Sequence, residues 1–484
     1  MFESVKNYFA EFKILKTMTK EFWLINAITF FDGLAYFSMV NIITLYLTSN
    51  AGFNDVDSGA WVGIFSLYVT AFIFGVGAVC DVIGIKKSYY IGIVLLVSTR
   101  FTLGVAPVYL NGPLLRYVIM GSIILMSLGT AFMGPIHNTA MRRFTSKENR
   151  STGFNLYYLI MNVGAALAGL LVTDGFRQGL SGIGLGFVKG FGEINGNLAI
   201  FDFGFLMYVI SFICTLMINE NNYADEEERV EINIEKSKRP LQIFLEVWKE
   251  KPFRTLVLFL VLTLGVRLVF THQFLVMPKY YTRVLFNDFE LGFANSINPI
   301  IIILGLIILI PVFKKFDTFK LIVVGMAVSA SSLIFMALPI DWYLMIPGIH
   351  NYSQAYKFII FTQITVFAVG ELIFSPRFTE YTAVVAPKDK VASYMSLAAL
   401  PMFIAKPING FISGALIASF SYEGIRAKID TGNISYNKSP EFMWLVYFLL
   451  ALLSPIAVIG MRKTLTASHK EHAAEEKRLA ASKA

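Results

Sequence analysis

Long apolar blocks alternate with short polar segments along this chain of 484 residues. Blocks such as Ile200–Met217, or Ile300–Ile310 with its flanks, reach the roughly 20 residues that cross a hydrocarbon core of about 30 Å. A segment in lipid must satisfy its own backbone hydrogen bonds, so each block is expected to be an α-helix. The expected spans are residues 22–48, 59–80, 88–107, 114–138, 152–173, 199–218, 253–278, 290–313, 319–340, 357–380, 391–419 and 440–461.

A polar stretch that contains the charged run Asp225–Arg229 separates the sixth expected span from the seventh. This layout predicts an all-α membrane protein with twelve transmembrane helices in two pseudo-symmetric six-helix bundles. Fused repeats of this kind build transporters whose substrate site lies at the repeat interface near mid-membrane. The expected parts are a cytosolic or interfacial N-terminal segment at 1–21, six-helix bundles at 22–218 and 253–462, a cytosolic linker at 219–252 and a cytosolic tail at 463–484.

The composition agrees with this layout, because 56% of the residues are hydrophobic and only 15% are charged. Soluble globular proteins average roughly 25% charged residues. The net charge of +8 comes mostly from Lys and Arg in short loops on one side of the expected spans. That bias predicts a multi-pass protein of the cell membrane with both termini and the linker in the cytosol, and it makes a nucleic-acid partner unnecessary. Cys80 and Cys214 lie at or inside spans and imply no disulfide or metal framework.

Five charged side chains fall near the middle of expected spans, where a lone charge costs at least about 2.5–3.5 kcal/mol. They are Asp32, Arg100, Arg267, Glu371 and Lys406. Together they indicate a polar cavity inside the bundle, although each of them could instead be the structural partner of another charge. Arg100 is best read as such a partner.

The chemistry of three of these residues suggests more specific roles. An arginine in a cavity suits a bidentate carboxylate or phosphate, which makes Arg267 a candidate substrate ligand. Lys406 precedes Pro407, which frees a carbonyl and favours a kink. His272 lies in the same span as Arg267 and is a candidate for titration during transport. For His272 and for His137, a satisfied polar histidine is the simpler interpretation.

The loop after the second span reads Gly-Ala-Val-Cys-Asp-Val-Ile-Gly-Ile-Lys-Lys from Gly77 to Lys87. Its glycines allow a tight turn and close helix approach. The pattern resembles the signature loop of the major facilitator superfamily. In that superfamily the loop is a cytoplasmic latch, so the resemblance implies a gating role for Asp81, Gly84, Lys86 and Lys87.

Within the superfamily, the chain resembles the proton-dependent oligopeptide transporters and their relatives. The matching segments are Gly153–Ala165, Asn298-Pro299, Gly370-Glu371 with Ser375-Pro376, and Asp32–Met39. The resemblance implies that Glu371 receives a substrate amino group, that Tyr36 lines the substrate site, and that a carboxylate carries the coupled proton.

The first expected span also departs from that family, which has two acids and an arginine there. Only Asp32 remains, with Thr29 and Gly33 in the other two places. The lysine of the family's fourth helix falls near Ile136-His137-Asn138, where no lysine stands. These departures concern the residues that couple proton and substrate.

The expected function is secondary active transport of small organic solutes, with peptides or peptide-like compounds as candidates, by proton-coupled symport. An exporter or an uncoupled facilitator on the same fold is the alternative. The substrate-binding candidates are Tyr36, Arg267, Glu371 and Lys406, and the proton-coupling candidates are Asp32, Glu371 and His272. The chain shows no phosphate-binding loop and no metal-ligand cluster, so neither a cofactor, a metal nor enzyme activity is expected. The expected partners are the solute, protons and the lipid bilayer, and the protein is expected to act as a monomer.

Overall fold

The computed structural model describes residues 18–146, 149–179, 196–222, 251–286, 289–313, 316–385 and 400–465. Most of the expected N-terminal segment, linker and C-terminal tail lies outside these described residues, as does the start of the expected span 391–419. The side chain of Asp81 also lies outside the description. The expectations for these parts stay predictions.

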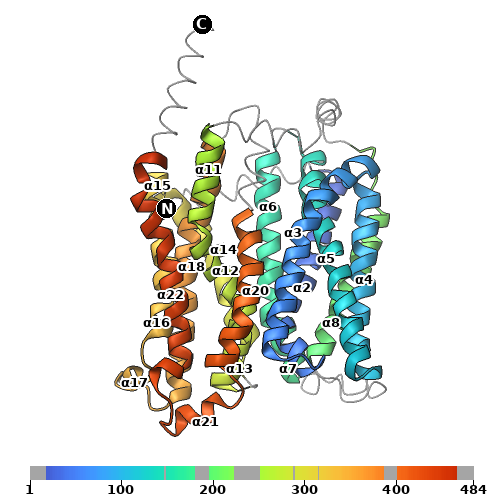
Figure 1. Ribbon diagram of the computed structural model, residues 1–484. Helices are drawn as coiled ribbons and strands as arrows, with labels where there is room; N and C mark the ends of the chain where they lie inside the picture. The colour runs from blue at the N-terminus through green and yellow to red at the C-terminus, as the bar shows by residue number, and fades with distance from the viewer. Residues whose placement is uncertain are drawn as a thin grey trace.

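The first half of the chain forms one group of helices (Figure 1). Its elements are α2 (Lys20–Ser49), α3 (Asp55–Ile83), α4 (Ile85–Tyr109), α5 (Gly112–Arg143), α6 (Arg150–Leu167), the π-helix η2 (Ala168–Thr173), α7 (Asp174–Gly179) and α8 (Gly196–Leu216). We call α2 to α8 the N-terminal half.

The second half forms another group, in which several spans are made of more than one helix (Figure 1). Its elements are α11 (Lys251–Leu262), α12 (Leu264–Leu275), α13 (Met277–Leu285), α14 (Leu291–Phe313), α15 (Thr318–Ser331), α16 (Ile334–Ala337), α17 (Ile340–Tyr343), α18 (Tyr352–Val385), α20 (Leu400–Phe420), α21 (Ile425–Asp430), the 3-10 helix η4 (Tyr436–Lys438) and α22 (Pro440–Gly460). We call α11 to α22 the C-terminal half.

Nine of the described helices are long and apolar enough to cross a membrane, and the bent pair α11–α12 makes up to ten. Two shorter apolar stretches, Leu291–Gly305 and Ile404–Phe420, lie in the two remaining expected spans, 290–313 and 391–419. The expected all-α membrane fold is therefore confirmed.

Several boundaries follow directly from local chemistry. The side chains of Thr19, Asn54 and Asp317 accept hydrogen bonds from backbone N–H groups in the first turns of α2, α3 and α15, at 3.2, 2.7 and 2.8 Å. Gly84 lies between α3 and α4 with φ +89°, a conformation that favours glycine, and so forms the predicted tight turn.

The expected span 253–278 is bent by 51° at Thr263, between α11 and α12. Beyond the bend, the backbone N–H of Val266 donates to Ser454 Oγ of α22 at 3.0 Å. A broken helix is tolerated at membrane depth when a neighbouring side chain satisfies the freed backbone group. Ser454 has that role here.

The two halves contact each other mainly through α3 against α20 and through α6 and η2 against α14. The α3–α20 contact is a crossing of glycines, Gly59 and Gly63 on α3 against Gly410 and Gly414 on α20. A Cβ atom at Gly59 would lie 2.7 Å from the backbone oxygen of Gly410, so only glycine permits this approach. We refer to these four residues as the glycine crossing.

Candidate functional site

Asp32 lies inside the N-terminal half, where it is the centre of a polar cluster. Its Oδ1 accepts a hydrogen bond of 2.8 Å from the Tyr208 hydroxyl of α8, and its Oδ2 lies 3.6 Å from His137 Nε2 of α5. The other ring nitrogen of His137, Nδ1, lies 2.7 Å from the Tyr89 hydroxyl of α4. Four helices thus hold one carboxylate and one imidazole together, with a tyrosine at each end.

Arg100 extends this cluster on its far side. Its guanidinium carbon lies 5.6 Å from the ring centre of Phe201 and 5.8 Å from that of Tyr208, and the residue is only 1% exposed. Tyr208 therefore lies between the cation of Arg100 and the carboxylate of Asp32. The three guanidinium nitrogens make no hydrogen bond within the described part of the chain, so the role of Arg100 as the partner of another charge stays a prediction.

Arg267 and Glu371 lie together in the C-terminal half. Glu371 of α18 accepts a hydrogen bond of 2.9 Å from Asn298 Nδ2 of α14. Arg267 of α12 is close enough to Glu371 for a favourable electrostatic interaction. Its guanidinium carbon also lies 4.6 Å from the ring centre of Phe378 and 4.7 Å from that of Phe374. The acid therefore already has an amide and a cation as neighbours, and the cation is stacked on aromatic rings.

Lys406 of α20 and Tyr36 of α2 meet between the two halves. Lys406 Nζ donates a hydrogen bond of 3.4 Å to the Tyr36 hydroxyl and lies 6.0 Å from the centre of its ring. Beside them, Phe37 of α2 contacts Phe274 of α12, with ring centres 6.1 Å apart. This is the point at which a mid-span cation of one half reaches the other half.

His272 lies in the core of the C-terminal half, away from these contacts. Its ring is 4.0 Å from that of Tyr447 and 5.7 Å from that of Trp444, measured between centres. Neither ring nitrogen has a hydrogen-bond partner within the part of the chain that the structure describes. The sequence put His272 ahead of His137 as a proton-coupling candidate, but the carboxylate lies next to His137.

The described contacts of the mid-span charges predicted to line one polar cavity fall into three groups. Asp32 belongs to the N-terminal half, Arg267 and Glu371 belong to the C-terminal half, and Lys406 lies between them. The sequence gives the depth of each charge but not its direction around the helix axis, and that direction decides which charges meet.

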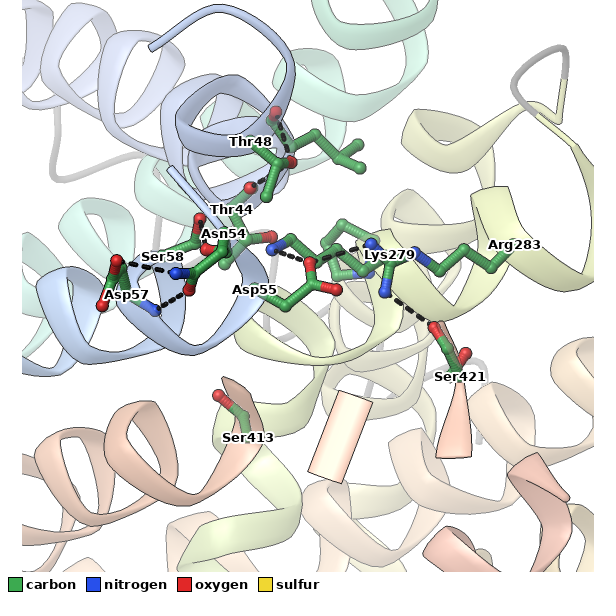
Figure 2. A network of polar contacts seen from close by, with 12 residues as sticks. Thr44, Thr48, Asn54, Asp55, Asp57, Ser58, Lys279, Arg283, Ser413 and Ser421 are labelled. Atoms are coloured by element: carbon green, nitrogen blue, oxygen red, sulfur yellow. Dashed lines mark hydrogen bonds and ion pairs between the residues drawn. The ribbon is translucent and has the colours of Figure 1, made fainter. Parts of the chain in front are cut away.

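An ion bridge between the halves was not predicted from the sequence (Figure 2). Asp55 Oδ1, at the start of α3, accepts bonds of 2.8 Å from Lys279 Nζ and from Arg283 Nη2 of α13. Arg283 also donates from Nη1 to the backbone oxygen of Ser421 at 2.7 Å. The Lys279 side chain is only 2% exposed. We refer to Asp55, Lys279 and Arg283 as the Asp55 bridge.

A second carboxylate joins the halves at the same face of the bundle, near the α7 and α13 labels (Figure 1). Asp174 of α7 accepts hydrogen bonds from the backbone N–H groups of Gly292 and Phe293, at 2.8 and 2.6 Å. It therefore caps the N-terminus of α14 across the interface. Nearby, Ser296 Oγ of α14 donates to the backbone oxygen of Ala166 at 2.9 Å. The two halves are closed against each other at this face.

The predicted latch residues lie at the turn between α3 and α4. Lys86 Nζ donates to the backbone oxygens of Leu216 and Ile218, at the end of α8, at 2.9 and 2.8 Å. Glu220 accepts from the backbone N–H of Lys86 at 2.8 Å, next to Gly84. Lys87 is exposed. These described contacts stay within the N-terminal half, and the latch role remains a prediction.

Comparison with known proteins assigns the chain to a family. The profile of the Major Facilitator Superfamily matches residues 25–408, well over half of the chain. Comparison with curated proteins finds no match. The fold is similar to that of a POT family transporter in complex with 5-aminolevulinic acid, at 15% identity and a TM-score of 0.67, over 92% of this chain and 96% of that one.

Two further solved structures share the fold. A POT family transporter in complex with a thioalcohol-conjugated peptide is 15% identical, with a TM-score of 0.65 over 92% of this chain and 96% of that one. The peptide transporter POT in complex with sulfate is 18% identical, with a TM-score of 0.60 over 92% and 95%. At these identities the likeness concerns the fold alone, and the superfamily is shown by the profile. The chain belongs to the Major Facilitator Superfamily and is a multi-pass membrane transporter rather than an enzyme.

Proposed function

We propose that this protein is a proton-coupled symporter of small organic solutes, with peptides or peptide-like compounds among the candidates. The observation that carries the proposal is the Asp32–His137 pair, a mid-span carboxylate with an imidazole 3.6 Å away inside the N-terminal half. A charge at that depth is costly and is retained where it serves a proton or ion pathway. Histidine is the side chain whose protonation state changes most readily near neutral pH.

Proton binding at this pair changes the charge balance of the N-terminal half. The Arg100 cation lies beyond Tyr208, which donates to Asp32, and a proton on His137 would place a cation directly next to the carboxylate. The Asp32 side chain keeps 21% exposure whereas that of His137 keeps 3%, so the carboxylate is the more accessible member of the pair. A proton would therefore reach His137 by way of Asp32.

Transport by this protein would proceed by alternating access, with the solute bound between the halves. The face that carries the Asp55 bridge, the glycine crossing and Asp174 is closed, and a solute reaches the middle from this face only after these contacts separate. The bias of basic residues puts the termini in the cytosol, so we assign this closed face to the outside of the cell membrane.

The test is uptake into proteoliposomes with an imposed inward proton gradient. We expect the gradient to drive accumulation in the wild type, and we expect Asp32→Asn and His137→Gln to lose most of the gradient-dependent rate. The control is His350→Gln, because His350 is an exposed histidine in a loop. Glu371→Gln and His272→Asn test the two other proton-coupling candidates in the same assay.

Equal uptake with and without the gradient would contradict the proposal. If Asp32→Asn and His137→Gln also behaved like the wild type, an uncoupled facilitator would be the better description. Outward-directed movement driven by the same gradient would instead indicate an exporter.

A further inference from the structure

The two mid-span carboxylates each have polar neighbours inside their own half. Asp32 has His137, Tyr208 and, beyond Tyr208, Arg100. Glu371 has Asn298 and Arg267. Each carboxylate therefore already has polar neighbours within its own half.

Lys406 differs from both carboxylates, because it lies where the two halves meet. Its one polar contact within the described part of the chain is the Tyr36 hydroxyl, and no described carboxylate forms an ion pair with it. A cation at this depth costs several kcal/mol unless an anion or water compensates it. With His137 neutral, the five mid-span charges sum to a single positive charge, and Lys406 is the cation among them that lies where the two halves meet.

This arrangement decides which charges a solute can carry. A zwitterion needs a free carboxylate for its ammonium group, and the sequence assigned that role to Glu371. Glu371 already accepts from Asn298 and has the Arg267 cation nearby, so a substrate ammonium would have to displace the amide and compete with that cation. A solute with one negative charge and no ammonium group fits the existing balance without displacing a partner.

We propose that Lys406 and Tyr36 bind the carboxylate of the transported solute, and that this solute is an organic monoanion without an ammonium group. The proposal rests on the transport function proposed above and specifies its substrate class. Lys406 supplies the charge, and the Tyr36 hydroxyl supplies a second donor from the opposite half. A carboxylate held by both residues joins α20 to α2, so binding favours closure of the halves around the solute.

The experiment is a thermal-shift measurement on the purified full-length protein. The probes are aliphatic and aromatic monocarboxylates, each tested beside an uncharged amide and an amino acid or dipeptide of the same skeleton. N-acetylalanine, N-acetylalaninamide and alanylalanine are one such set. A ligand that binds the folded state raises Tm, and we expect only monocarboxylates to do so.

Three variants connect the shift to the proposed site. Lys406→Gln should weaken binding of the best monocarboxylate at least about tenfold, equivalent to about 1.4 kcal/mol, and Lys406→Arg should keep part of it. Tyr36→Phe should cause a smaller loss. The matched control is Lys428→Gln, because Lys428 Nζ also lies close to a tyrosine ring, 5.0 Å from the centre of Tyr422, but is exposed. The Tm of each variant without ligand shows whether it is folded.

The proposal is overturned if zwitterions or amides raise Tm as much as their monocarboxylate counterparts, or if no monocarboxylate raises it. It is also overturned if the shift survives Lys406→Gln. Gradient-driven uptake separates this result from the proposed function. A zwitterion that accumulates with the proton gradient refutes the monoanion and leaves symport intact. A monocarboxylate that binds but does not respond to the gradient refutes coupling and leaves the binding site intact.

Discussion

The closed face joins the two halves by two different kinds of contact. In the glycine crossing, backbone lies against backbone and no side chain takes part. In the Asp55 bridge, the charged groups of Lys279 and Arg283 both donate to one carboxylate oxygen of Asp55. The first contact depends on shape and the second on charge, so substitutions, pH and salt should affect them differently. That difference can be tested, starting with the largest expected effect.

Replacing Gly59 by Val should prevent this face from closing. The added Cβ would lie 2.7 Å from backbone atoms of Gly410 and Gly414, which cannot move away as a side chain can. We expect a cost to the closed state above the about 1–3 kcal/mol of ordinary overpacking, and loss of transport. The separation of spin labels at Val56→Cys and Glu423→Cys, which are exposed positions on the two halves, measures the closure.

The control for this substitution lies on the same helix. Gly75→Val adds the same side chain to α3, but no neighbouring atom lies within 4 Å of the new Cβ. Normal closure in Gly59→Val, or an equal defect in Gly75→Val, would show that the glycine crossing does not limit closure.

Asp55→Asn should weaken closure less than Gly59→Val does. The change leaves Lys279 and Arg283 without their carboxylate, but the Asp55 and Arg283 side chains are 16% and 13% exposed and the asparagine oxygen can still accept a hydrogen bond. The cost should therefore stay below the about 3–5 kcal/mol of a fully buried pair, and below that of the backbone clash at Gly59. The same label distances should shift towards the open form. Asp57→Asn is the control, because Asp57 is exposed in the same turn and receives its hydrogen bond from Asn54. Unchanged distances in Asp55→Asn would mean that the glycine crossing alone keeps this face closed.

Closure should also respond to alkaline pH through Lys279. Burial lowers the pKa of Lys279 from its ordinary 10.5 to about 8, and the neighbouring Asp55 opposes that shift. The open form, in which Lys279 is hydrated, therefore holds more protons between these two values. Raising the pH through that interval should favour the closed form. A Lys279→Arg variant, which stays charged, should show no such trend in the label distances, and an identical trend would contradict the assignment.

The smallest effect is expected for Asp174→Asn. The amide oxygen of asparagine can still accept one of the two backbone hydrogen bonds, so the change removes the other bond and the interaction of the charge with the α14 dipole, together about 1–2 kcal/mol. Asp174→Ala, which removes both hydrogen bonds to Gly292 and Phe293, should have the larger effect on closure. Equal effects of the two variants would show that the charge, and not the cap, is what matters.

Much of the fold could be predicted because lipid imposes it locally. The apolar blocks, the tight turn at Gly84 and the charge depths all follow from neighbouring residues in the sequence. The bend at Thr263 could not be predicted, because the residue that satisfies the freed backbone is Ser454, on another helix.

The contacts between elements were less predictable for the same reason. Asp55 and Lys279 are 224 positions apart, and in the sequence each looks like a loop charge at the end of a span. For His137 a signal did exist, since the fourth-helix lysine of the transporter family that the sequence resembles falls near residues 136–138. A basic group at that place is what Asp32 contacts in the structure.

The Asp55 bridge and the Asp174 cap share a polarity that matters once they separate. In both, the N-terminal half contributes the carboxylate, and the C-terminal half contributes the cations or the backbone donors of α14. Opening would therefore expose an entrance with carboxylates on the N-terminal half and with cations and backbone donors on the C-terminal half. The electric field across this entrance would steer an approaching anion towards the C-terminal half. The association rate of the anion should therefore fall as salt is added.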